Sequence, residues 1–142
     1  MPKQILFLCT GNSCRSQMAE GWTNILKKDT FKAYSAGIAP KGVDPRALKV
    51  MSETGIDISG QTSKDIDSLG DMEFDYVVTL CDNANEACPF FPAKTMLIHH
   101  GFDDPPRLAE GEADEEKALN HYRRVRDEIK AFVESIEEEL GK

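Results

Sequence analysis

The chain alternates apolar runs of strand length with segments whose apolar residues recur at helical spacing, and this alternation limits the possible folds. Apolar runs predict strands at 5–9, 31–36, 74–80 and 95–99. Helical spacing follows residue 16, recurs between Asp44 and Gly55, and fills 122–140. Such a pattern predicts an α/β fold around a mainly parallel sheet. Ligands of these sheets bind beyond the carboxyl ends of the strands, where Cys9 and Cys81 fall.

Length and composition narrow the class of protein. The 142 residues fit one domain spanning 1–142, and 40% hydrophobic residues can form a core without disulfides. The chain has no apolar run of the ~18 residues that a membrane span needs, and its start lacks the pattern of a secretory signal. We therefore expect a cytoplasmic protein and a monomer. The net charge of −8, with no basic stripe, argues against nucleic acid or membrane as partners.

Four cysteines, at positions 9, 14, 81 and 88, raise the alternatives of catalysis, metal binding and plain burial. Their Cys-x4-Cys and Cys-x6-Cys spacings differ from the tighter knuckles of most structural zinc sites. The adjacent His99 and His100 are expected to point to opposite sides of a strand end. We therefore expect no metal and no cofactor.

The segment from Cys9 to Ser16 has the features of an oxyanion-binding loop. It joins a predicted strand to a predicted helix, and Gly11 permits a tight backbone that exposes its amides. The positive end of the helix and the planar Arg15 fork suit a tetrahedral anion. These groups also stabilise a thiolate, so Cys9 is expected to be a nucleophile that accepts a hydrogen bond from Ser16. The alternative is that Cys9 merely ends a buried strand.

The octapeptide Cys9-Thr10-Gly11-Asn12-Ser13-Cys14-Arg15-Ser16 resembles the phosphate loop of the low-molecular-weight tyrosine phosphatase superfamily. Tyr34-Ser35-Ala36-Gly37 and Asp104-Pro105 resemble further landmarks, so the resemblance covers nearly the whole chain. It implies a three-layer sandwich, in which a four-stranded parallel sheet carries helices on both faces. It also implies that the loop residues bind substrate and that Asp104 is the general acid. Asp103 is the adjacent candidate, and the acidic and proline residues at 103–106 also suit a simple turn.

The surroundings of Cys81 and Cys88 resemble the thioredoxin-coupled arsenate reductases of this superfamily. Pro106 stands where tyrosine phosphatases of this size usually carry an aromatic residue. The resemblance implies that Cys9 attacks arsenate and that Cys81 then displaces arsenite, forming a Cys9–Cys81 disulfide. Cys88 would convert it to Cys81–Cys88, which thioredoxin reduces. Cys14 would be a bystander.

Other functions stay open on the sequence alone. A phosphatase would use Cys9, Arg15 and Asp104, form a phospho-Cys9 intermediate, and leave Cys81 and Cys88 as ordinary buried residues. A non-enzymatic oxyanion-binding protein would need no second cysteine. A redox-regulated binding module would need no Arg15.

Two finer expectations concern conformation and ions. A regular helix from Cys81 to Cys88 would separate their Cα atoms by about 10 Å, whereas a disulfide needs less than about 7 Å. That segment should therefore loosen when the two cysteines bond. Some members of the resembling family bind potassium through residues matching Asn12, Glu20 and Ser35, but Lys64 replaces the expected carboxylate and Asp65 comes one position late. We expect weak potassium dependence or none.

Overall fold

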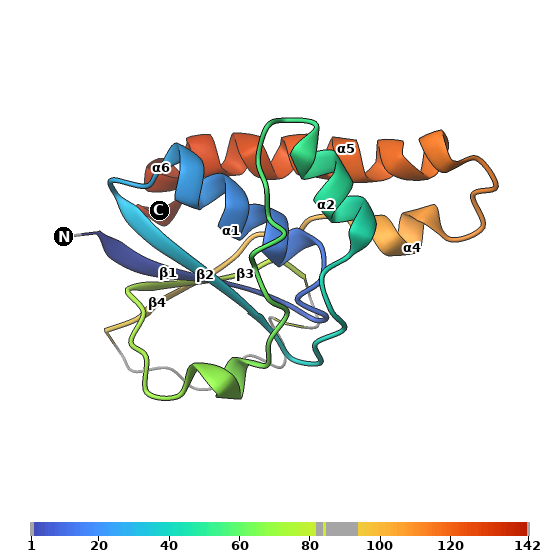
Figure 1. Ribbon diagram of the computed structural model, residues 1–142. Helices are drawn as coiled ribbons and strands as arrows, with labels where there is room; N and C mark the ends of the chain where they lie inside the picture. The colour runs from blue at the N-terminus through green and yellow to red at the C-terminus, as the bar shows by residue number, and fades with distance from the viewer. Residues whose placement is uncertain (1, 82–83, 85–93, 142) are drawn as a thin grey trace.

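The computed structural model describes residues 2–81, 84 and 94–141. Its core is a four-stranded parallel sheet in the order β2-β1-β3-β4 (Figure 1). This architecture confirms the predicted α/β fold, and it places the first and third strands of the sequence side by side. The strands are β1 Lys3–Cys9, β2 Phe31–Gly37, β3 Tyr76–Thr79 and β4 Met96–His99.

The central strand β1 places the start of the oxyanion-binding loop. Ile5, Leu6, Phe7 and Leu8 are fully buried, because β1 is paired on both edges and covered on both faces. Cys9 lies level with Gly37 of β2, and Leu8 lies level with Thr79 of β3. The carboxyl ends of β1, β2 and β3 therefore meet at one edge of the sheet.

Helices complete the layers on the two faces. The helix α1, Arg15–Leu26, packs on β1 and β2, and α5, Glu115–Glu134, packs on α1. Both α2, Pro45–Ser52, and α4, Pro105–Ala109, pack against α5. The short 3-10 helix η1, Ile66–Leu69, lies on the opposite side of the sheet from α1 and α5 (Figure 1).

The helix predicted for 122–140 is wrong as one continuous element. The structure has α5 and a separate α6, Ile136–Leu140, because Ser135 leaves helical geometry between them. The Ser135 hydroxyl donates to the Ala131 carbonyl oxygen at 3.2 Å. A serine hydroxyl that bonds the backbone in this way competes with helical hydrogen bonding.

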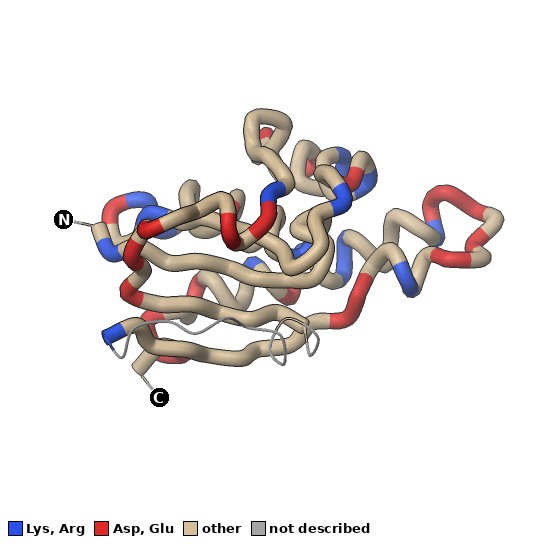
Figure 2. The backbone as a smooth tube through the Cα atoms, turned by 90° about the horizontal axis from the view of Figure 1, so that it is seen from below, with Lys and Arg blue, Asp and Glu red and all other residues tan. Residues whose placement is uncertain are grey.

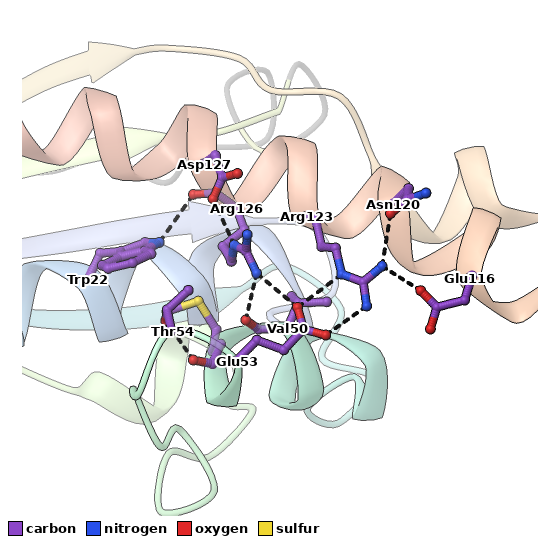
Figure 3. Close-up of polar contacts among 10 residues, drawn as sticks. Trp22, Val50, Glu53, Thr54, Glu116, Asn120, Arg123, Arg126 and Asp127 are labelled. Carbon is purple, nitrogen blue, oxygen red and sulfur yellow. Dashed lines mark hydrogen bonds and ion pairs between the residues drawn. The ribbon is translucent and has the colours of Figure 1, made fainter.

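A cluster of arginine contacts joins α2 to α5 (Figure 3). The Arg123 guanidinium donates to both carboxylate oxygens of Glu53, at 3.0 and 2.7 Å, and lowers the pKa of that carboxyl. Arg126 donates to Glu53 and to the Val50 carbonyl oxygen at 2.9 Å. The Trp22 indole of α1 donates to the Arg126 carbonyl oxygen at 3.2 Å. These contacts fix the positions of α1, α2 and α5 relative to one another.

This arrangement fixes the segment that begins α2. The side chain of Asp44 caps α2 by accepting from the Arg46 amide, and it also accepts from the buried Tyr122 hydroxyl at 2.6 Å. The Asp44 amide donates to the Ser13 carbonyl oxygen at 2.9 Å. The start of α2 is therefore tied both to α5 and to the oxyanion-binding loop.

Acidic residues cluster in the loop that joins α4 to α5, at one end of the molecule (Figure 2). Asp114 caps α5 by accepting from the Glu116 amide at 2.9 Å, and Glu115 and Glu116 occupy the first turn. Negative charge at a helix N-terminus is stabilising.

None of the helices in the described part of the chain combines the length and the apolar composition that a membrane span requires.

Gly37 allows the oxyanion-binding loop to lie directly against β2. A Cβ atom at this position would lie 2.8 Å from the Thr10 carbonyl oxygen and 2.9 Å from the Asn12 amide nitrogen. Gly37→Ala should therefore displace the loop backbone and lower the free energy of unfolding by about 1–3 kcal/mol. Denaturant titration measures this, and Gly60→Ala is the control, since a Cβ there meets nothing within 4 Å. Equal stability of the two variants would contradict the close packing.

Candidate active site

A cavity of about 220 Å³ lies at the carboxyl end of β1. Six of the eight residues predicted to form the oxyanion-binding loop line it, and Asn12 and Ser16 are the two that do not. The structure therefore brings the predicted loop and Asp104 together around one space. The lining residues are Cys9, Thr10, Gly11, Ser13, Cys14, Arg15, Lys41, Asp104 and Pro106.

Asn12 holds the loop in shape from behind. It is fully buried and has a φ of 44°, in the left-handed region that is unfavourable for most residues with a side chain. Its side-chain oxygen accepts from the Lys64 amide at 2.8 Å, and its carbonyl oxygen accepts from Gln17 at 3.0 Å. Its side-chain nitrogen donates to the Ser16 hydroxyl oxygen at 2.8 Å. These bonds hold the strained conformation in place.

The Ser16 hydroxyl lies 3.0 Å from the Cys9 sulfur. Because Ser16 accepts a hydrogen bond from Asn12, its single proton is available to donate to that sulfur. Helix α1 begins at Arg15 and directs its positive end toward the same region. The Ser16 hydroxyl and the positive end of α1 thus both face the Cys9 sulfur, and this arrangement suits Cys9 to act as a nucleophile.

Cys14 lies in the same loop under different electrostatic conditions. Burial raises the pKa of the Cys14 thiol well above its ordinary value, and the nearby Asp44 carboxylate raises it further. A thiol held in its protonated form is a poor nucleophile. The raised pKa of Cys14 agrees with the expectation that this residue contributes its backbone to the loop and that its sulfur takes no part in the chemistry.

The structure distinguishes between the two candidate acids. Asp104 lines the Cys9 cavity, and its carboxylate lies 3.7 Å from the Arg15 guanidinium. Asp103 instead forms an exposed ion pair with Arg124 of α5 at 2.9 Å. Arg15 is also held by a 3.0 Å hydrogen bond from its guanidinium to the Phe102 carbonyl oxygen. Asp104 is thus the carboxyl group that can exchange a proton with a molecule bound above Cys9.

Cys81 lies close to the loop, because β3 pairs with β1 and both strands end at the same edge of the sheet. Its sulfur is 3.3 Å from the Thr10 hydroxyl oxygen and accepts from the Ala84 amide at 3.4 Å. A second cavity, of about 620 Å³, is lined by Cys81 and Arg107 and shares Arg15 and Asp104 with the first. The Arg15–Asp104 pair therefore lies between the Cys9 cavity and the Cys81 cavity.

The described cysteines Cys9, Cys14 and Cys81 are all free thiols. Cys88 lies outside the described residues, as does most of the segment between it and Cys81. The proposed role of Cys88 and the expected loosening of that segment therefore stay predictions.

The adjacent residues His99 and His100 make different contacts. The His99 ring lies 2.8 Å from the Thr79 hydroxyl, whereas the His100 ring stacks on Phe102 and packs against Phe132. Among the residues that the structure describes, no three potential metal ligands gather in one place.

Sequence reasoning missed two cationic side chains near the site. Lys41 lines the Cys9 cavity and Arg107 lines the Cys81 cavity. Neither carries a sequence signal, because a single basic residue in a loop or a short helix is common on any protein surface. Only the fold brings them to these cavities.

The residues that match a potassium site form a small polar cluster behind the loop. The Ser35 hydroxyl donates to the Glu20 carboxylate at 2.6 Å. Burial raises the pKa of the Glu20 carboxyl, and the Ser35 hydrogen bond and the Lys64 ammonium partly offset that rise. The Asp65 carboxylate, which comes one position after the expected carboxylate, caps η1 by accepting from the Asp67 amide. Lys64 thus supplies positive charge near Glu20.

Comparisons with known proteins agree with this geometry. Residues 4–142 match the family model described as low molecular weight phosphotyrosine protein phosphatase. The chain is 52% identical to an arsenate reductase of Halalkalibacterium halodurans over 96% of both chains. It is 54% identical to an arsenate reductase of Bacillus subtilis over 89% of both. A solved arsenate reductase in its phosphate-binding state superposes with a TM-score of 0.75, at 33% identity over 94% of this chain and 95% of that one.

The Lys64 ammonium should make a potassium ion unnecessary beside Glu20. A cation bound to the native state raises the melting temperature, so replacing NaCl by KCl at equal ionic strength should leave the melting temperature of the wild type unchanged. Lys64→Asp removes the ammonium and adds a carboxylate, so this variant should be stabilised by potassium over sodium. A rise in the melting temperature of the wild type, or a several-fold rise in its activity with potassium, would contradict the assignment.

Proposed function

Because the chain belongs to the low molecular weight phosphotyrosine protein phosphatase family, we propose that it applies the oxyanion site of this family to the reduction of arsenate to arsenite. The observation that carries the proposal is the sulfur of Cys81, 3.3 Å from the hydroxyl of Thr10, the residue that follows Cys9. A phosphatase has no use for a second thiol at this place. The relatives named arsenate reductase, about half identical over most of the chain, support the same activity.

The first step is nucleophilic attack on arsenic. Arsenate binds to the loop amides and the Arg15 guanidinium, which offer donors to its charged oxygens. The Cys9 thiolate forms a sulfur–arsenic bond while one oxygen leaves, and Asp104 gives that oxygen a proton so that it departs as water. Arsenic stays pentavalent in this step. The Ser16 hydrogen bond to Cys9 holds the sulfur in place before the attack.

The second step carries out the reduction. The Cys81 thiolate attacks the Cys9 sulfur, and the electron pair of the sulfur–arsenic bond passes to arsenic, which becomes trivalent and leaves as arsenite. The two sulfurs are oxidised together to a Cys9–Cys81 disulfide. The Thr10 hydroxyl and the Ala84 amide can both donate a hydrogen bond to the Cys81 sulfur, which holds it beside the loop that carries Cys9.

The last step regenerates the nucleophile. The Cys88 thiolate attacks Cys81, forms a Cys81–Cys88 disulfide and releases Cys9 as a thiolate, in an ordinary thiol–disulfide exchange. Thioredoxin then reduces this disulfide. On this proposal the enzyme spans 1–142 as one catalytic domain, acts as a monomer in the cytoplasm, and serves in arsenic detoxification.

Hydrolysis of phosphate monoesters is the second candidate activity. Phosphate and arsenate present similar tetrahedral oxyanions, and the Cys9 cavity contains the three groups that a phosphatase of this family would use: Cys9, Arg15 and Asp104. We propose it as a residual activity, because Pro106 and Lys41 line the cavity instead of an aromatic side chain that would pack on a substrate ring.

Two substitutions separate the proposed reduction from hydrolysis. Cys9→Ser should abolish both activities, because this loop does not deprotonate an alcohol as it does a thiol. Cys81→Ser should abolish multiple-turnover reduction, measured as arsenate-dependent NADPH consumption with thioredoxin and its reductase. The same variant should retain hydrolysis of an aryl phosphate. Equal loss of both activities in Cys81→Ser would mean that Cys81 has a structural role and would overturn the proposal.

A further inference from the structure

Lys41 is held against the oxyanion-binding loop by the main chain. Its amide donates to the Gly11 carbonyl oxygen at 2.9 Å, and the Ala39 amide donates to the Thr10 carbonyl oxygen at 2.8 Å. The segment that follows β2 therefore runs along the loop, hydrogen-bonded at two successive carbonyls. This attachment fixes the Cα atom of Lys41 at the rim of the Cys9 cavity, so only the side chain is free to adjust.

The side chain of Lys41 crosses the loop at its glycine. Its Cδ atom is 3.3 Å from the position that a Cβ on Gly11 would take, so the methylenes occupy space left by the absent side chain. The ammonium is two bonds beyond this point. Lysine commonly packs its aliphatic part on the protein while its charged end faces water. Lys41 thus presents its charge at an open cavity.

The Lys41 ammonium has no hydrogen-bond or ion-pair partner among residues 2–81, 84 and 94–141. The other cation that lines the cavity, Arg15, is already engaged by Asp104 and by the Phe102 carbonyl oxygen. The chain as a whole carries a net charge of −8, which repels an approaching anion. The positive charge of Lys41 at the rim opposes this repulsion of anions at the entrance to the Cys9 cavity.

We propose that Lys41 is a specificity-determining residue that draws small, multiply charged oxyanions into the Cys9 cavity and takes no part in the chemical step. The inference rests on the proposed function for the identity of the reaction, but oxyanion binding can be measured without it. Within the described part of the chain, Lys41 forms no hydrogen bond or ion pair with the Cys9 sulfur or with Asp104, so its effect should be confined to association and affinity.

The charges of substrate and product make such a residue useful. Arsenate is an anion at neutral pH, whereas arsenous acid is uncharged. A cation at the rim therefore attracts the substrate without retaining the product. Inorganic phosphate has the charge and shape of arsenate, so it should compete at the same place and can serve as a probe that is not reduced.

The test compares Lys41→Met with Lys28→Met, which removes the same charge from an exposed lysine in the loop before β2, at the opposite end of the parallel strands. At low ionic strength, Lys41→Met should lower kcat/KM for arsenate by about three- to tenfold and weaken phosphate binding, measured calorimetrically, by a similar factor. The kcat should be unchanged. Lys41→Arg should behave as the wild type, and Lys41→Glu should lose more than Lys41→Met.

Salt provides the second measurement. The difference between Lys41→Met and the wild type should shrink toward unity near 1 M salt, where the Debye length falls to about 3 Å. If Lys41→Met matches Lys28→Met in kcat/KM and in phosphate affinity at low salt, or if Lys41→Met lowers kcat, the inference is overturned. If the wild type fails to reduce arsenate, the proposed function fails, while the phosphate-binding comparison still decides the role of Lys41.

Discussion

The hydrogen bond from the Asn12 side chain to the Ser16 hydroxyl is the interaction on which the site depends. It directs the single Ser16 proton toward the Cys9 sulfur, 3.0 Å away. It also joins two residues of the loop, Asn12 and Ser16, to each other. Asn12 has a positive φ, a conformation that costs of order 1–3 kcal/mol. The Lys64 amide and the Gln17 side chain hold Asn12 in that conformation, so the segment before η1 and the helix α1 both support the loop that carries Cys9.

The Arg15–Asp104 pair gives the site a second organising feature. It separates a cavity that contains Cys9 from a cavity that contains Cys81, and both cavities share its two side chains. The two cavities are therefore adjacent, with the Arg15–Asp104 pair in the lining of both. Asp103 cannot serve in the same way, because Arg124 holds it on the surface of α5.

Much of this arrangement could be predicted from the sequence. The run at 5–9 is apolar throughout because β1 is buried on both faces, and the loop after it combines glycine, arginine and cysteine between a strand and a helix, a context that favours an anion site. A run of apolar residues and the residue types of a tight loop can both be recognised in a short stretch of sequence.

The features that were missed depend on tertiary contacts. The predicted strand at 74–80 is longer than β3, because pairing with β1 and β4 begins only at Tyr76, and Phe74 is buried without joining the ladder. The end of α5 at Ser135 carries no glycine or proline signal. The position of Lys41 over Gly11 follows from hydrogen bonds between segments about thirty residues apart in sequence, which a periodicity argument cannot find.

The most direct test of the account is a single turnover of the Cys88→Ser variant with arsenate and no reductant, followed by peptide mass spectrometry. The account predicts one arsenite released per enzyme and a disulfide that joins the peptides of Cys9 and Cys81. Cys14 should stay reduced, because burial and the Asp44 carboxylate raise the pKa of its thiol. Arsenite release with Cys81 still reduced, or a disulfide that includes Cys14, would contradict the assignment of the two sulfurs.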